Sequence, residues 1–303
     1  MRKRIDAHVH IMERVAGFAS RGELYAIGGG KARWANGDVI QLFPPDRADR
    51  NFTAEILLKL LDDFSIEKAV ILQGSFYGFQ NDYIADSVRK YPDRLKAAAA
   101  FDPYCVRAQE IFDRLCGEMG FRIFKFEVSP GAGLNSYHSG FPLDGMPLAP
   151  YIEKIAALGA TLVLDLGSPG DVSWQPQAVA RIAQKYPDLK IVICHLLAPK
   201  LGDRRALEYG LHTLALPNVW FDLAAVESNV RPEKYPYPTG RDYIALGKEI
   251  AGADKLIWGT DTPSTLTRDT YPHLISYIEE SGIFTEPELD KVFYQNAKDA
   301  YSL

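Results

Sequence analysis

The chain has little cysteine: Cys105, Cys116 and Cys194 are its three cysteines in 303 residues. No two of them form a Cys-x-x-Cys pair, and an odd number cannot all be joined in disulfides. Reduced thiols are typical of a cytoplasmic protein, which is the location we expect. Cys194 precedes His195, but neighbours on a strand face opposite ways, so we expect a buried thiol at Cys194 rather than a nucleophile.

The chain also lacks an excess of basic residues, long apolar runs and phosphate-binding motifs. Its net charge of −5 argues against a nucleic-acid partner. No apolar run reaches membrane-spanning length, so we expect no membrane contact. No Gly-x-Gly-x-x-Gly follows the first apolar segment, which leaves a dinucleotide-binding fold without support. The hydrophobic fraction of 47% is that of a globular protein.

What the chain does contain is a regular alternation of strand-like and helix-like segments. Nearly all-apolar strands are expected at 4–10, 68–73, 95–101, 121–126, 160–165, 190–195, 219–223 and 256–261. Helical spacing is found at 53–64, 82–91, 107–119, 148–158, 176–186, 203–214, 240–251 and 270–281. Such strands call for a parallel sheet covered by helices, and eight units favour a closed barrel. We therefore predict an α/β fold, a single-domain (β/α)8 TIM barrel over residues 1–303.

Two long loops interrupt this alternation. Residues 11–52 follow the first strand and are rich in aromatic residues, and residues 127–147 follow the fourth. Loops of this length in a compact domain are usually functional. We expect both to overhang the mouth of the barrel as a lid or pocket wall. An oligomer contact, and with it a homo-oligomer, is the alternative for the first loop.

Polar residues stand where the apolar strands end. They are His8 and His10 on the first strand, Lys125 on the fourth, Asp165 on the fifth, His195 on the sixth and Asp261 on the eighth. In a barrel these ends meet at one face, where catalytic residues cluster. Two histidines with one or two carboxylates can hold a divalent ion, whose bound water loses a proton near neutral pH. His195 could take that proton, and Asp261 could be a ligand, a proton shuttle or both.

These residues carry a family resemblance. His8-x-His10, a strand-six His195 and Trp258-Gly259-Thr260-Asp261-Thr262-Pro263 resemble the amidohydrolase superfamily, and more narrowly its amidohydrolase-2 (amidohydrolase-related) branch. Ile5-Asp6-Ala7-His8 and Asn296-Ala297 support the likeness, which spans the whole chain. The resemblance implies a metal-dependent TIM barrel from a branch that contains lactonases and other hydrolases, nonoxidative decarboxylases and hydratases. It implies His8, His10 and Asp261 as metal ligands and His195 as the residue that activates water or substrate.

One position departs from the pattern of that branch. Relatives usually have a histidine where this chain has Asp165. Asp165 could complete a harder site that shifts preference from zinc toward manganese. The replacement could equally mean weak metal binding or none, since some lactonases of the branch work without metal. Lys125 stands where binuclear relatives have a carbamylated lysine, but we expect it to contact a substrate anion or form a structural ion pair.

The sequence leads to one main hypothesis and two alternatives. We expect a hydrolase with one divalent metal, zinc or manganese, that directs activated water at a lactone, ester or amide carbonyl. The substrate is expected to be a small carboxylated molecule contacted by Lys125, Tyr137, His138 and Arg231, because guanidinium suits carboxylates. Nonoxidative decarboxylation of an unsaturated or aromatic acid is the close alternative. A catalytically silent binding barrel is the alternative from another class.

Overall fold

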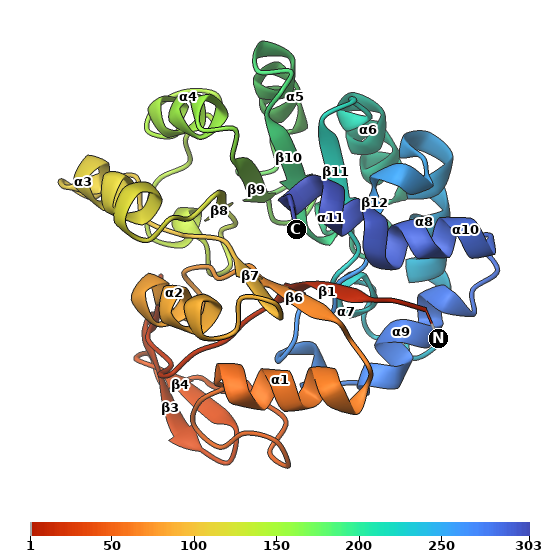
Figure 1. The fold of residues 1–303 in the computed structure, drawn as a ribbon, viewed down its shortest axis with the longest axis horizontal. Helices are drawn as coiled ribbons and strands as arrows, with labels where there is room; N and C mark the ends of the chain where they lie inside the picture. The colour runs from red at the N-terminus through yellow and green to blue at the C-terminus, as the bar shows by residue number, and fades with distance from the viewer. Residues whose placement is uncertain (1) are drawn as a thin grey trace.

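The computed structural model describes residues 2–303 and contains the predicted ring of parallel strands (Figure 1). One sheet has the order β1-β6-β7 and the other the order β12-β11-β10-β9-β8. Isolated parallel bridges, Ala99 to Phe124 and Val9 to Thr262, join the edges of the two sheets. The strands are β1 (Ile5–Val9), β6 (Lys68–Ile71), β7 (Leu95–Ala97), β8 (Ile123–Glu127), β9 (Thr161–Asp165), β10 (Lys190–Ile193), β11 (Val219–Asp222) and β12 (Leu256–Ile257).

Helices follow these strands and surround them, as the prediction of a (β/α)8 barrel requires (Figure 1). The first helix buries an apolar stripe of Leu57, Leu60 and Leu61, and the Thr53 hydroxyl caps its N-terminus. The helices are α1 (Ala54–Asp63), α2 (Asn81–Lys90), α3 (Ala108–Asp113), α4 (Ala149–Ala157), α5 (Pro176–Lys185), α6 (Arg204–Leu214), α7 (Val226–Asn229), α8 (Pro238–Ala251) and α9 (Tyr271–Glu279). The fold prediction is confirmed.

The interior of the barrel is packed by side chains that alternate along the strands. Ile5 and Ala7 of β1, Val163 of β9 and Val192 of β10 belong to this inner cluster. Two C-terminal helices, α10 (Glu286–Asp290) and α11 (Asn296–Tyr301), complete the chain, and Ala297, Ala300 and Tyr301 of α11 pack against the inner cluster. The other end of the barrel, where the strands finish, is therefore the end that carries the polar residues.

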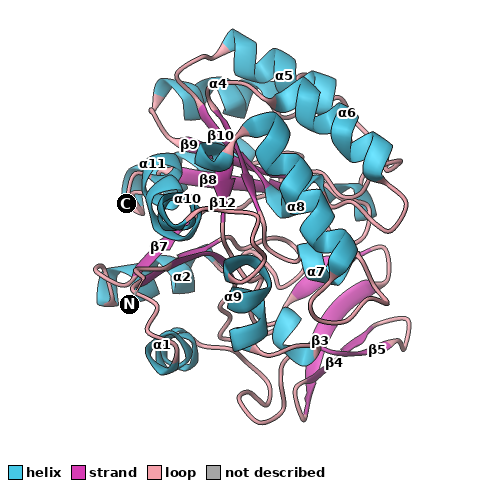
Figure 2. Ribbon diagram, turned by 90° about the vertical axis from the view of Figure 1, so that its right-hand side faces the viewer, coloured by secondary structure: helices cyan, strands magenta, loops and turns pink. Residues whose placement is uncertain are grey.

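The first long loop is not irregular. It forms a four-stranded antiparallel sheet of β2 (Gly17–Ala19), β3 (Gly22–Gly28), β4 (Lys31–Trp34) and β5 (Val39–Gln41), which lies beside the barrel (Figure 2). The alternation of exposed and buried residues in β4 ends on the fully buried Trp34. The second long loop, 127–147, contains only a short helical turn at Leu134–Ser136 beyond the end of β8. A lid role for either loop stays a prediction.

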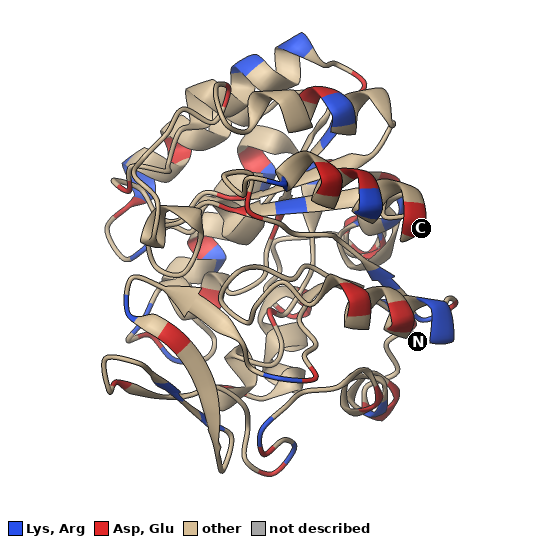
Figure 3. Cartoon of the chain, turned by 90° about the vertical axis from the view of Figure 1, so that its left-hand side faces the viewer, with Lys and Arg blue, Asp and Glu red and all other residues tan. Residues whose placement is uncertain are grey.

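The outer surface mixes charges of both signs. Figure 3 shows Lys and Arg interspersed with Asp and Glu along the outer helices. Several of these charges form ion pairs, such as Arg94 with Asp62 and Arg114 with Asp82. Across residues 2–303, none of the helices has the length and apolar character that a membrane span needs.

Several strands end earlier than expected, and two of them were expected to carry site residues. We predicted that the sixth strand runs through His195 and the eighth through Asp261, but β10 ends at Ile193 and β12 at Ile257. Both residues have left-handed backbone angles, with φ of 60° at His195 and 59° at Asp261, which a strand cannot continue. The two side chains are thus held by turns at the mouth of the barrel.

Candidate active site

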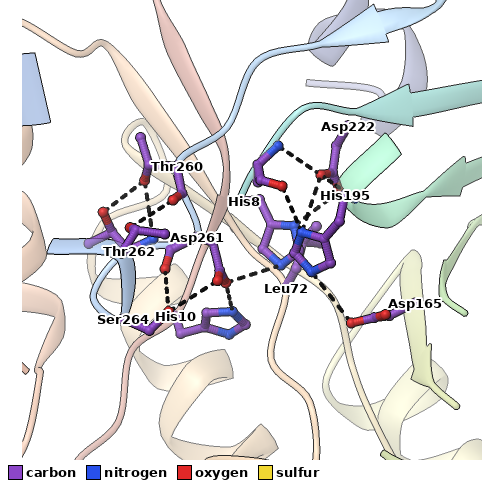
Figure 4. Close-up of polar contacts among 12 residues, drawn as sticks. His8, His10, Leu72, Asp165, His195, Asp222, Thr260, Asp261, Thr262 and Ser264 are labelled. Carbon is purple, nitrogen blue, oxygen red and sulfur yellow. Dashed lines mark hydrogen bonds and ion pairs between the residues drawn. The ribbon is translucent and has the colours of Figure 1, made fainter. Parts of the chain in front are cut away.

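His8 stands at the centre of the polar cluster, on β1, and is fully buried. Its Nδ1 donates to Asp222 Oδ2 at 3.0 Å, so its Nε2 faces the mouth of the barrel as an acceptor. Lys125 Nζ lies 3.3 Å from this Nε2, and the His195 ring stacks on the His8 ring with centroids 4.8 Å apart (Figure 4). Burial first, and then the charge of Lys125, holds the pKa of His8 well below its usual range. His8 is therefore a neutral imidazole whose Nε2 is free to bind a metal ion.

His10 and Asp261 meet beside His8, as their strand-end positions predict. His10 Nε2 lies 2.9 Å from Asp261 Oδ1, and His8 Nε2 lies 3.9 Å from the same oxygen. Ser264 Oγ donates to the other oxygen, Asp261 Oδ2, at 3.1 Å. Burial raises the pKa of Asp261, but the bond from His10 and the neighbouring histidines lower it by more, to below its usual range. Asp261 is thus an anion facing two imidazoles.

This arrangement fits a divalent metal ion. One ligand atom each from His8, His10 and Asp261 lies within 4.8 Å of the other two. Ligand atoms around a tetrahedral zinc are about 3.3 Å apart, and the two measured separations lie on either side of that value. A metal-bound histidine usually donates its other ring nitrogen to a carboxylate, as His8 does to Asp222. The donor set suits zinc or a similar ion.

His195 and Asp165 form a second pair next to this group. His195 Nδ1 donates to the carbonyl of Ala224 at 2.8 Å, which leaves Nε2 as the ring atom that gains or loses a proton. Nε2 lies 3.4 Å from Asp165 Oδ2 (Figure 4). Burial lowers the pKa of His195, but the hydrogen bond and charge of Asp165 raise it by more, to about 10. In the metal-free protein His195 is therefore an imidazolium paired with a carboxylate.

The backbone around His195 is strained. His195, Leu196, Leu197 and Ala198 all have positive φ, between 47° and 67°, in consecutive positions. Left-handed backbone costs about 1–2 kcal/mol for each such residue. The backbone N–H of His195 donates to Asp222 Oδ1 at 2.9 Å, so the carboxylate that orients His8 also holds this turn. Strain of this kind is concentrated at functional sites, where the surroundings stabilise it.

Lys125 and Glu127 stand at the end of β8, on the face that points into the barrel. Lys125 Nζ donates to the carbonyl of Leu72 at 3.0 Å, in addition to its contact with His8. Burial raises the pKa of Glu127 to about 7. The Glu127 carboxylate occupies the space beside Gly74, where a Cβ would lie only 1.9 Å from Oε2. A lysine and a titratable carboxyl therefore lie beside the histidines at the mouth of the barrel.

A cavity of about 500 Å³ opens over these groups. His10, Lys125, Asp165, His195 and Asp261 line its floor. Both long loops contribute to its walls. The first loop provides Arg21, Ile40, Gln41 and Leu42, and the second provides Ser129, Gly131 and Ala132. Arg231 and Arg268 also line the cavity. Volumes of this order suit small-molecule ligands.

Tyr137 and His138, predicted to contact the substrate, lie apart from the floor of this cavity. His138 Nε2 pairs with Asp102 Oδ2 at 2.7 Å, and its ring lies against that of Tyr104. The Tyr137 ring contacts Phe18 of β2 edge-on. Neither residue lines the cavity, whereas Arg231 does. Their substrate contacts stay predictions without geometric support.

Sequence reasoning missed three residues that build the site. Asp222 is fully buried at the end of β11 and bonds both His8 and the backbone of His195. Asp6, also fully buried, accepts from Thr260 N, Thr260 Oγ1 and the Tyr271 hydroxyl, and so ties β1 to the turn that carries Asp261. Glu127 is the third. Asp222 ends an apolar strand like the residues that were recognised, so that signal was present in the sequence.

Gly259 explains how closely the first and last strands approach. A Cβ on Gly259 would lie 2.9 Å from both the Cβ and the backbone nitrogen of His8. The backbone N–H of Asp261 donates to the His8 carbonyl at 2.8 Å across this contact. A residue without a side chain is therefore needed for His8 and Asp261 to face the same point.

Comparison with known proteins shows the family and the fold of the chain. A family model described as amidohydrolase matches residues 5–303. No curated protein matches the chain. Among solved structures, a probable 2-pyrone-4,6-dicarboxylic acid hydrolase from Acinetobacter baumannii with citric acid bound is similar at 18% identity and a TM-score of 0.72, covering 99% of this chain and 100% of its own.

Two further solved structures share the fold. An amidohydrolase from Burkholderia multivorans with bound zinc has 16% identity and a TM-score of 0.74, with 99% of each chain covered. The 5-carboxyvanillate decarboxylase from Sphingomonas paucimobilis has 15% identity and a TM-score of 0.59, covering 81% of this chain and 82% of its own. At such identities the likeness shows the fold, and the family model shows the family. The chain belongs to the amidohydrolase family of enzymes.

Proposed function

We propose that this enzyme is a metal-dependent hydrolase that attacks the lactone, ester or amide carbonyl of a small carboxylated substrate. The observation that carries the proposal is the convergence of His8, His10 and Asp261 on one point, directly beside the His195–Asp165 pair and under one cavity. Family membership agrees with it. A zinc-bound relative of the same fold makes zinc the first metal to test, and manganese the second.

His8, His10 and Asp261 would hold the ion. A bound divalent ion lowers the pKa of its water toward neutrality and polarises a carbonyl oxygen. Asp222 fixes the ring of His8 so that Nε2 points at the ion site. Asp165 lies outside the group of converging ligand atoms, and we propose that it acts through His195 rather than as a ligand.

In this proposal His195 is the general base that accepts a proton from water. Its Nδ1 is committed to the Ala224 carbonyl, so the exchangeable proton sits on Nε2, next to Asp165. A positive charge placed beside His195 would lower its pKa and so favour the neutral ring that acts as a base. Asp165 keeps that ring oriented and stabilises the imidazolium once it has taken a proton.

Positive groups on the cavity wall support the assignment of a carboxylated substrate. Lys125 lies on the floor of the cavity, and Arg231 and Arg268 lie at its rim. Guanidinium groups bind carboxylates with two parallel hydrogen bonds, which fixes the orientation of the substrate. The substrate carboxylate would lie against these residues while the carbonyl faces His195 and Asp261.

The experiment is a screen of the metal-loaded enzyme against carboxylated lactones, aryl esters and amides, read as acid release and as carbon dioxide release in parallel. Hydrolysis that is lost by more than about a thousandfold in His195→Asn supports the proposal. Carbon dioxide release from unsaturated or aromatic acids, without hydrolysis, would favour the decarboxylase alternative. A well-folded, metal-loaded protein with neither activity on the whole panel would favour the silent binding barrel.

A further inference from the structure

A second cavity of about 640 Å³ adjoins the first. It lies beside α7 and α9, and Arg231 and Arg268 line both cavities. The two arginines therefore stand at the junction between the cavities. A ligand held there reaches into both.

The two arginines form no close ion pair with residues 2–303, although the charge of Glu227 acts on Arg231 across the cavity. The Nε of Arg231 donates to the Ser228 carbonyl at 2.8 Å, and no carboxylate among residues 2–303 forms an ion pair with either guanidinium. Burial first, and then the charge of Arg268, lowers the pKa of Arg231. Two neighbouring guanidinium groups at a cavity junction form a binding site for a ligand anion.

Glu227 lies within the second cavity and has no part in the proposed reaction. It is only 4% exposed, and its Oε1 accepts from the Ser228 hydroxyl at 2.7 Å. No side-chain hydrogen bond from residues 2–303 reaches Oε2, and Glu227 lines the cavity. Burial raises the pKa of Glu227 to about 7. A buried acceptor that faces a cavity needs a partner from a ligand or from water.

The residues that line the second cavity indicate which chemical group of a ligand would bond to Glu227. Tyr235 and His273 stack on one another with centroids 4.2 Å apart and form an aromatic wall. Aromatic side chains pack well against a ring on the ligand. Three carboxylates also line this cavity, but Glu233 is bonded to Thr239 and Asp269 to His273. Arg231, Lys234 and Arg268 form no ion pair within residues 2–303. These cations disfavour a ligand cation, so a neutral hydroxyl is the donor that fits Glu227.

We propose that the second cavity is the distal half of the substrate site, and that it takes the hydroxylated aryl group of an elongated acid whose carboxylate lies between Arg231 and Arg268. The hydroxyl donates to Glu227 Oε2, and the ring lies against Tyr235 and His273. This inference rests on the proposed function only in taking the first cavity as the place of reaction.

The test measures the binding of three small probes by calorimetry. They are para-hydroxyphenylpropionate, phenylpropionate and para-hydroxyphenylpropanol, which differ in the hydroxyl and in the carboxylate. For the unmodified enzyme we expect the hydroxylated acid to bind about tenfold more tightly than phenylpropionate. We expect the neutral alcohol to bind at least about tenfold more weakly than the hydroxylated acid.

Single substitutions test which residues cause these differences in probe affinity. In Glu227→Leu the advantage of the hydroxyl should fall to less than about twofold, and in Arg268→Gln both acids should weaken equally. Glu233→Gln is the matched control, because Glu233 lines the same cavity but its carboxylate is already bonded to Thr239. It should keep the tenfold preference. Circular dichroism and thermal melting confirm that each variant is folded.

A separate variant keeps this inference distinct from the proposed function. His10→Ala removes a predicted metal ligand at the other end of the site, and it should bind the three probes within about twofold of the unmodified enzyme. Probe binding as expected in an enzyme without hydrolytic activity would support the inference and contradict the proposed function. Lack of binding of both acids, or a hydroxyl preference that survives in folded Glu227→Leu, would overturn the inference.

Discussion

At the scale of single residues, the site depends on carboxylates that touch no substrate. Asp222 is the main example, because it bonds the ring of His8 and the backbone of His195 at the same time. The sequence predicted the residues at the mouth, His8, His10, His195 and Asp261, since each follows an apolar run. The sequence could not predict which of these side chains contact one another. The left-handed backbone angles that orient His195 and Asp261 cannot be recognised from residue type, so nothing in the sequence indicates these turns.

We predict that Asp222→Asn lowers the affinity for the metal ion by about 10- to 100-fold. The amide keeps the shape of the carboxylate but weakens its hydrogen bond to His8 Nδ1 and no longer compensates the buried positive charge. A metal-buffered titration with zinc measures the change. Asp254→Asn is the control, because Asp254 is an exposed partner of Lys291 far from the site, and it should leave the affinity unchanged.

The His195–Asp165 pair gives a pH-dependent contribution to stability in the metal-free protein. The pKa of His195 is raised to about 10 from an ordinary value of 6.5, so its pairing stabilises the fold fully below pH 6.5 and ever less as the pH rises to about 10. The pKa of Asp165 is lowered, so its contribution exists above its ordinary value of 3.8 and is lost as the pH falls through its folded pKa.

We therefore predict that Asp165→Asn lowers the free energy of unfolding by roughly 3 kcal/mol near pH 6, and by much less near pH 10. Urea unfolding in the presence of a chelator, at pH values from 6 to about 10, measures this difference. Asp144→Asn, which removes the partner of the exposed Arg181, should show no such trend. A constant difference for Asp165→Asn over this range would mean that His195 is neutral in the metal-free protein.

At the scale of elements, the site forms because β1 and the segment after β12 lie unusually close. Gly259 makes that approach possible, and Asp6 bonds Thr260 and Tyr271 across it. The strands and helices of the barrel were predictable from their apolar periods, helped by the prolines Pro92 and Pro187 that follow α2 and α5. The antiparallel sheet β2 to β5 was not, because β2, β4 and β5 are only three or four residues long and the longer β3 alternates weakly.

We predict that Gly259→Ala destabilises the protein by about 1–3 kcal/mol and weakens metal binding, because the new Cβ displaces β1 at His8. Thermal unfolding and zinc titration measure the two effects. Gly117→Ala is the matched control, since a Cβ at the exposed Gly117 meets nothing within 4 Å. Equal stability and metal affinity in Gly259→Ala and Gly117→Ala would show that the close approach does not position His8.

At the scale of the whole molecule, the residues that stabilise the barrel and the residues of the candidate site lie in different parts of it. Its interior and the end near α11 are apolar, and Thr161 Oγ1 donates there to the Ala300 carbonyl at 2.7 Å. The opposite end collects the histidines, carboxylates and arginines around two adjoining cavities. Changes to the loops at that end can therefore alter the substrate without disturbing the core.

The measurement that tests the central claim most directly is the metal content of the enzyme purified without chelator, compared with His10→Ala. The account predicts one zinc or manganese per chain in the unmodified enzyme. In His10→Ala it predicts an affinity for that metal at least about tenfold lower. A folded, unmodified enzyme that retains no ion after incubation with zinc and with manganese, or an equal content in folded His10→Ala, would contradict it.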